Sequence, residues 1–63
     1  MLHKVIIRSN KTDSECEELI NSAVAEYPNY EVFFDMLIES TFTVLNSNQQ
    51  TLYTLMIRIE EAE

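Results

Sequence analysis

Apolar residues recur at helical spacing between positions 13 and 27. They form one continuous stripe made of Cys16, Leu19, Ile20, Ala23, Val24 and Tyr27. Just before the stripe, Thr12-x-x-Glu15 and Ser14-x-x-Glu17 both fit a capping box, and Pro28 follows its last member. Both ends of a helix are therefore marked, and we predict a helix over residues 13–27.

The rest of the chain has the composition and period of β-strands. Residues 2–8 are rich in β-branched side chains, and residues 30–45 and 50–60 alternate with a period of two. A strand over 30–45 would be about 50 Å long, so we expect a bend or bulge within it. Residues 46–49 supply the turn, with asparagine in place of glycine. This order predicts a single α+β domain over residues 1–63, a β-α-β-β unit whose helix packs on one face of a three-stranded sheet.

The period of two also predicts which side chains face the helix. These are Val5 and Ile7 in the first strand, the even positions of the second strand and the odd positions of the third. A hairpin centred on residues 47 and 48 keeps inward residues opposite each other. The pairs that we expect are Phe42 with Tyr53, Ser40 with Leu55, Ile38 with Ile57, and Met36 with Ile59. Most aromatic residues, namely Tyr27, Tyr30, Phe34, Phe42 and Tyr53, then belong to the core.

One helix leaves the second face of the sheet open. We expect that face to carry Leu2, Ile6, Phe33, Leu37, Leu52 and Met56, which is more apolar surface than a soluble monomer usually exposes. Isologous dimers are the commonest assembly, so a second copy is the most economical partner. We predict an interface made of Phe33, Leu37, Leu52, Met56 and Ile6, with Phe33 as its anchor.

The net charge of −7 narrows the possible partners. Eleven carboxylates against four basic side chains repel nucleic-acid phosphates, so direct binding to DNA or RNA is disfavoured. We interpret the acidity as solubilising. The alternative is an inhibitor that mimics nucleic acid, such as a phage counter-defence protein, acting through Asp13, Glu15, Glu18 and Asp35.

A second alternative concerns the few basic residues. Lys4, Arg8 and Arg58 are expected on the open face, where an oligomer could use them to sequester a small anionic ligand such as a nucleotide. The interpretation that we favour pairs them with Asp35, Glu39 and Glu60 across the strands.

Several kinds of chemistry are disfavoured by what the chain lacks. It contains no glycine, which phosphate-cradling loops and nucleophile elbows require. With Cys16 and His3 as the only cysteine and histidine, no internal disulfide forms and a zinc site is not expected. We expect Cys16 in the core, His3 on the surface, and Asp35 and Glu39 too far apart to share a proton. The sequence thus predicts no catalytic site, cofactor or metal.

The expected compartment is the cytoplasm, or that of the host cell for a phage-encoded chain. No apolar run approaches the roughly 20 residues of a membrane span. The start of the chain lacks the pattern of a signal peptide, and a free cysteine is typical of reducing compartments.

The order of basic and acidic elements along the chain is similar to that of a known group of small proteins. A short basic strand (His3 to Arg8) precedes an acidic amphipathic helix (Asp13 to Tyr27), and the terminal strand contains Tyr-x-x-Met-Ile (Tyr53 to Ile57). In these features the chain resembles the small acidic sporulation-associated proteins that also occur as phage accessory proteins. The resemblance implies a small bacterial or phage protein that acts by binding. Our leading hypothesis is a non-catalytic, self-associating module that binds a protein partner through the open face or the acidic helix.

Overall fold

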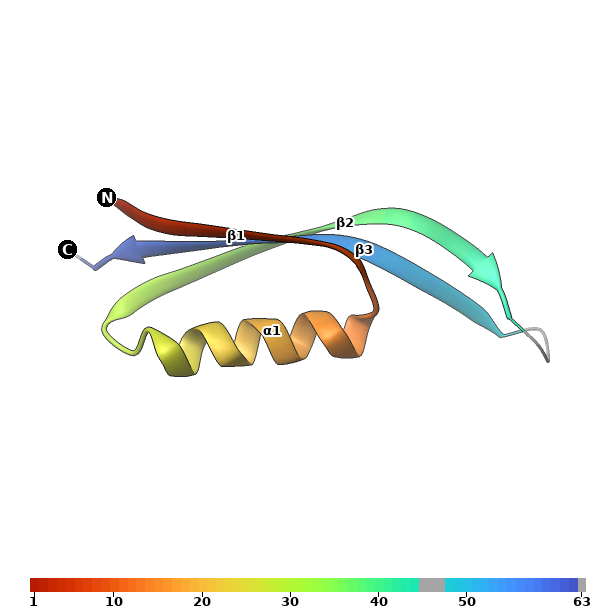
Figure 1. Cartoon of the computed structure of the whole chain (residues 1–63), viewed down its shortest axis with the longest axis horizontal. Coiled ribbons are helices and arrows are strands. Elements are labelled where there is room, and N and C mark those ends of the chain that lie inside the picture. The colour runs from red at the N-terminus through yellow and green to blue at the C-terminus, as the bar shows by residue number, and fades with distance from the viewer. Residues whose placement is uncertain (45–47, 63) are drawn as a thin grey trace.

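The computed structural model describes residues 1–44 and 48–62 and has the predicted order of elements. They are β1 (Leu2–Lys11), α1 (Asp13–Glu26), β2 (Tyr30–Thr43) and β3 (Gln49–Glu61). β3 lies between β1 and β2 and is antiparallel to both. α1 runs along one side of this sheet (Figure 1). The predicted α+β fold is confirmed, and the strand order, which the pattern leaves open, is β1-β3-β2.

α1 begins with the first of the two candidate capping boxes. The Thr12 hydroxyl accepts a hydrogen bond from the Glu15 amide at 3.3 Å, and the Thr12 amide donates to the Glu15 carboxylate at 3.0 Å. The bond from the Thr12 amide is the largest cause of a lowered pKa of the Glu15 carboxyl, and the Thr12 side chain lowers this pKa further. The helix ends at Glu26, one residue earlier than predicted, with Tyr27 as its C-cap.

Replacing Thr12 by alanine should lower the free energy of unfolding by about 1 kcal/mol, because an amide of the first turn loses its acceptor. The matched control is Ser14→Ala, since Ser14 lies inside the helix and does not cap it. Urea denaturation followed by circular dichroism measures both variants. An equal loss in the two would show that the Thr12 box does not stabilise the helix.

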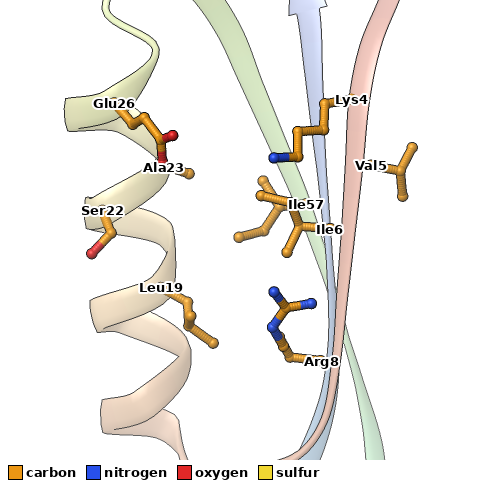
Figure 2. Close-up of a pocket in the computed structure, with 9 residues that line it drawn as sticks. All are labelled: Lys4, Val5, Ile6, Arg8, Leu19, Ser22, Ala23, Glu26 and Ile57. Atoms are coloured by element: carbon orange, nitrogen blue, oxygen red, sulfur yellow. The ribbon is translucent and has the colours of Figure 1, made fainter.

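β1 turns the opposite face to the helix from the predicted one. Ile6 packs against the core, whereas Val5 and Ile7 are 41% and 55% exposed. Lys4 and Arg8 also point toward α1, and Val5 points away (Figure 2). Because Val5, Ile6 and Ile7 are all apolar, an apolar side chain faces the helix whichever side of β1 is turned inward. Lys4 and Arg8 can share the inward side with Ile6, since at an edge strand their long side chains still reach solvent. The prediction that Val5 and Ile7 face the helix is therefore wrong, as is the placement of Ile6 on the open face.

The β2–β3 hairpin pairs four positions away from the predicted register up to Ile38 and three positions away from Ser40 onward. The observed pairs are Met36 with Leu55, Ile38 with Tyr53, Ser40 with Leu52, and Phe42 with Gln50. The expected bulge is confirmed, because Glu39 is an extra residue between the pairs of Ile38 and Ser40. After the bulge Ser40 and Phe42 pair with even residues of β3, which alternate with the buried ones, so the prediction that these two residues face the helix is wrong. The predicted turn and the end of the second strand fall partly on residues 45–47, which lie outside the described residues.

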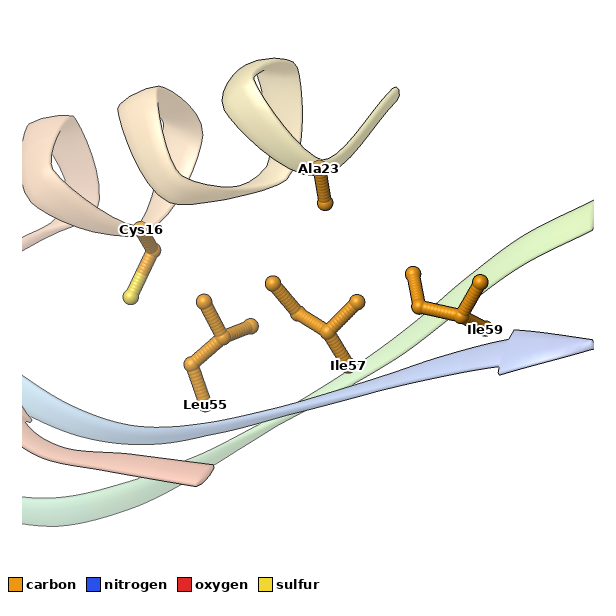
Figure 3. Packing of buried hydrophobic residues seen from close by; sticks show 5 residues of the cluster. All are labelled: Cys16, Ala23, Leu55, Ile57 and Ile59. Atoms are coloured by element: carbon orange, nitrogen blue, oxygen red, sulfur yellow. The ribbon is translucent and has the colours of Figure 1, made fainter. Parts of the chain in front are cut away.

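The fully buried core is small and lies between α1 and β3 (Figure 3). It consists of Cys16, Ala23, Leu55, Ile57 and Ile59, each at most 4% exposed. The helix contributes the two small side chains and the central strand the three large ones, so the helix backbone can approach the sheet closely. The prediction that Cys16 belongs to the core is confirmed.

α1 is too short to cover the whole sheet. Its 14 residues span about 21 Å, whereas the 14 residues of β2 span about 46 Å. The hairpin therefore continues past the start of the helix (Figure 1). Phe34 and Phe42, both predicted in the core, are 50% and 44% exposed. Phe42 pairs with Gln50 and lies on the side of the sheet away from α1. Val24 of the predicted helical stripe lies on α1 itself and is 52% exposed. The radius of gyration of 13.9 Å exceeds the roughly 10.6 Å expected for a compact chain of this length.

Candidate interaction face

The side of the sheet opposite α1 carries apolar side chains from all three strands. We call it the open face, because among the described residues no element covers it (Figure 1). On this side lie the residues that alternate with the buried ones of β3 and their cross-strand partners. Its apolar members are Leu2, Val5, Ile7, Phe33, Leu37, Phe42, Leu52 and Met56. Of the predicted interface, Phe33, Leu37, Leu52 and Met56 are there, and Ile6 is replaced by its neighbours in β1.

Cross-strand pairing arranges the centre of the open face in rows. Arg58 of β3 lies between Val5 of β1 and Phe33 of β2, and the next row has Met56 between Ile7 and Asp35. Paired side chains on one face of antiparallel strands are about 5 Å apart, so each row is continuous. The apolar side chains therefore form a connected patch with charged residues inside it.

Arg58 is held in place by two contacts on the open face. Its guanidinium carbon lies 5.1 Å from the centroid of the Phe33 ring, within the range of a cation–π interaction. Its Nη1 donates to Glu60 Oε2 at 2.8 Å. Both residues belong to β3, so this ion pair lies within one strand and is not the predicted pairing across strands. Phe33 is thus partly covered and 39% exposed, whereas Leu37 is 69% exposed. Leu37 is the better anchor for a partner, a preference that sequence alternation cannot reveal.

The three cations predicted to converge are divided between the two sides of the sheet. Arg58 lies on the open face, whereas Lys4 and Arg8 lie on the side of α1 (Figure 2). The prediction that Lys4 and Arg8 lie on the same side of β1 is correct, because they are four residues apart. The prediction that this side is shared with Arg58 is wrong, because β1 turns this side to the helix. A site made of all three residues is therefore wrong.

The predicted acidic face is also divided. Asp13, Glu15 and Glu18 lie in the first turns of α1, whereas Asp35 pairs with Met56 and lies on the open face. Glu15 is engaged in the capping box. A hydrogen bond to the Asp13 carboxylate raises the pKa of the Tyr53 hydroxyl. The four carboxylates do not form one surface for a partner.

Glu39 has a structural contact that the sequence pattern does not reveal. Its Oε2 accepts a hydrogen bond of 2.7 Å from the backbone amide of Asn10. Asn10 has φ of 57°, in the left-handed region that asparagine tolerates, and lies in an irregular stretch of β1. The carboxylate thus joins an irregularity in β1 to the bulge in β2, across the central strand. The Glu39 carboxylate is therefore engaged with the Asn10 amide and not with the Asp35 carboxylate.

His3 is exposed, as predicted, and it also packs against two aromatic rings. The centroid of its ring lies 4.7 Å from that of Tyr30 and 5.8 Å from that of Tyr27. His3 is the extra residue where the β1–β3 register shifts between Leu2 and Lys4. A bulge at this position leaves no mark in the alternation, so the sequence does not predict this cluster.

The described residues form neither a metal-binding cluster nor a membrane-spanning helix. Within residues 1–44 and 48–62, no three His, Cys, Asp or Glu side chains are grouped so that they could hold a metal ion. The helix found in the described part of the chain is neither long nor apolar enough to cross a bilayer.

Comparison with known proteins gives no further guide to the open face. No protein-family model, curated protein or solved structure matches the chain. The resemblance to sporulation-associated proteins stays a prediction.

Proposed function

We propose that the chain is a non-catalytic interaction module that self-associates through the open face. The observation that carries the proposal is the connected apolar patch across all three strands, on a protein with few fully buried side chains. The accessible surface is 4690 Å², whereas a monomer of 7.4 kDa is expected to expose about 4200 Å². A dimer would remove the excess.

A second copy of the same chain could cover the open face within the usual size of a protein interface. A standard interface buries about 800 Å² on each partner, roughly a sixth of this surface. Antiparallel stacking of the two faces would cover the exposed Leu37 in both copies. A fully exposed apolar side chain gains about 1.5–3 kcal/mol when it is buried, so a few such residues offset much of the cost of association.

The charges of the open face are self-complementary. Arg58 and Asp35 occupy adjacent rows, and in the described residues Asp35 has no cation within 4.0 Å. In an isologous dimer residue i meets j and j meets i, so Arg58 of each copy can approach Asp35 of the other. Stacked apolar rows together with reciprocal charge contacts favour a specific dimer over non-specific hydrophobic association.

Leu37→Glu should raise the dissociation constant of the dimer by about 100-fold or more, because each copy would bury an unpaired carboxylate. The matched control is Val24→Glu, which makes the same kind of change at a 52% exposed residue of α1, away from the open face. Sedimentation velocity from 1 to 200 µM measures the association of both variants and the unaltered chain. Circular dichroism checks that each remains folded, and Ile7→Glu is a second variant on the same face.

A chain that sediments as a monomer over this whole range would overturn the proposal. So would dimers that Leu37→Glu and Ile7→Glu leave intact. A dimer that Val24→Glu dissociates equally well would move the interface to the helix.

A further inference from the structure

A groove of about 320 Å³ lies between β1 and α1, on the side of the sheet away from the open face. Its floor is apolar and is made by Ile6 and Ile57 of the sheet and Leu19 and Ala23 of the helix. Figure 2 shows the Lys4 amine and the Arg8 guanidinium directed from β1 into the space between strand and helix. The groove therefore combines an apolar floor with two cations at one wall.

The two cations have no carboxylate partner in the described part of the chain. Neither Lys4 nor Arg8 forms an ion pair within 4.0 Å there, although the protein carries eleven carboxylates. Arg8 donates one hydrogen bond of 2.8 Å, from Nη1 to the carbonyl of Ile7, which leaves its other N–H groups available. Glu26 is the one acidic residue among those that line the groove. In a chain of net charge −7, this concentrates positive charge beside an apolar surface.

We propose that this groove binds a small organic anion with an apolar body, either a carboxylate or a phosphate ester. The head group would lie between Lys4 and Arg8, since the planar guanidinium matches the geometry of both kinds of anion. The body would cover Ile6 and Leu19. The volume is at the lower end of the range for ligand sites, about 300–1,000 Å³, and suits a short chain or a single ring. The site lies on the other side of the sheet from the proposed dimer interface and does not depend on it.

Titration of ¹⁵N-labelled protein with octanoate and with octyl phosphate tests the proposal. We expect the largest amide shifts in residues 4–8 and 19–26, and saturation by at least one of the two anions. The tighter of the two identifies the head group. Octanol supplies the apolar body without the charge, and inorganic phosphate supplies the charge without the body, so both should bind at least ten-fold more weakly.

Substitutions separate this groove from a general attraction to cations. Lys4→Gln combined with Arg8→Gln should weaken binding of the tighter anion at least ten-fold. Lys11→Gln combined with Thr43→Glu makes the same change of net charge outside the groove and should leave binding within two-fold. The titration is repeated on Leu37→Glu, so that a failure of dimerisation is distinguished from a failure of the groove.

Three results would overturn the proposal. Octanol binding as tightly as the anions would show that the cations do not recognise the ligand. An equal loss of affinity for the anion in the two double variants would show that binding depends on net charge and not on the groove. Shifts confined to the open face, or no saturation by either anion, would show that the groove is not the site.

Discussion

Ile57→Ala should remove about 3–4 kcal/mol of the free energy of unfolding, which is a third or more of the total expected for a chain of this length. Ile57 is 1% exposed in the central strand, where Ile6 of β1 and Phe34 of β2 are its cross-strand partners. Deleting most of a buried isoleucine costs 2–5 kcal/mol, because the cavity collapses only in part. A domain of 63 residues is stabilised by about 3–9 kcal/mol in total. We therefore expect the variant to be partly unfolded at 37 °C.

The matched control for this loss is Ile38→Ala, which deletes the same atoms from a side chain that is 68% exposed. It should cost less than about 1 kcal/mol. Urea denaturation at 25 °C measures both variants, at several protein concentrations because self-association would add to the apparent stability. Equal losses in the two variants would contradict the assignment of the core to the central strand.

The faces of β3 are predictable because its pattern is unambiguous. Leu55, Ile57 and Ile59 alternate with Met56, Arg58 and Glu60, of which two are charged. A central strand under a helix buries one face fully, so the wholly apolar set is the buried one. The helix is predictable for the same reason, since its capping box and Pro28 mark both ends. In each case one interpretation satisfies all the local signals.

The register of the hairpin and the phase of β1 are not determined in this way. Up to Ile38 the slip is four residues and keeps every side chain on its original face, so the pairs Ile38–Ile57 and Ile38–Tyr53 satisfy the alternation equally. After the bulge the slip is three residues, and Ser40 and Phe42 change face. In β1, Val5, Ile6 and Ile7 are all apolar, and either phase buries something. The choice depends on how the edge strand meets the helix, which is a tertiary effect.

These two ambiguities decide how much of the functional surface was predictable. The existence of an open face follows from counting one helix against three strands. Its β3 residues and the β2 residues before the bulge follow from alternation, whereas Phe42 lies there because of the bulge. The phase of β1 exchanges Ile6 for Val5 and Ile7 on that face. It also moves Lys4 and Arg8 away from Arg58 to the helix side, where the groove lies.

Raising the pH from 8 to 9.5 should lower the free energy of unfolding by about 1 kcal/mol because of Cys16. The thiol is 1% exposed, and its burial raises its pKa, with a smaller contribution from the charges of Asp13 and Glu15. A folded-state pKa above the unfolded value gives stability that is fully present below the unfolded pKa, about 8.5, and is lost as the pH rises towards the folded pKa. The slope cannot exceed about 1.4 kcal/mol per pH unit for one proton.

Cys16→Ala separates this effect from other alkaline titrations. Alanine keeps a small apolar side chain under the helix and removes the titrating proton, so this variant should show a flat stability profile between pH 8 and 9.5. The upper limit excludes Tyr53, whose hydroxyl has a raised pKa because it is hydrogen-bonded to Asp13, and which titrates only at higher pH. Urea denaturation across this range measures both proteins. An equal decline in the two would show that the thiol proton is not what couples folding to alkaline pH.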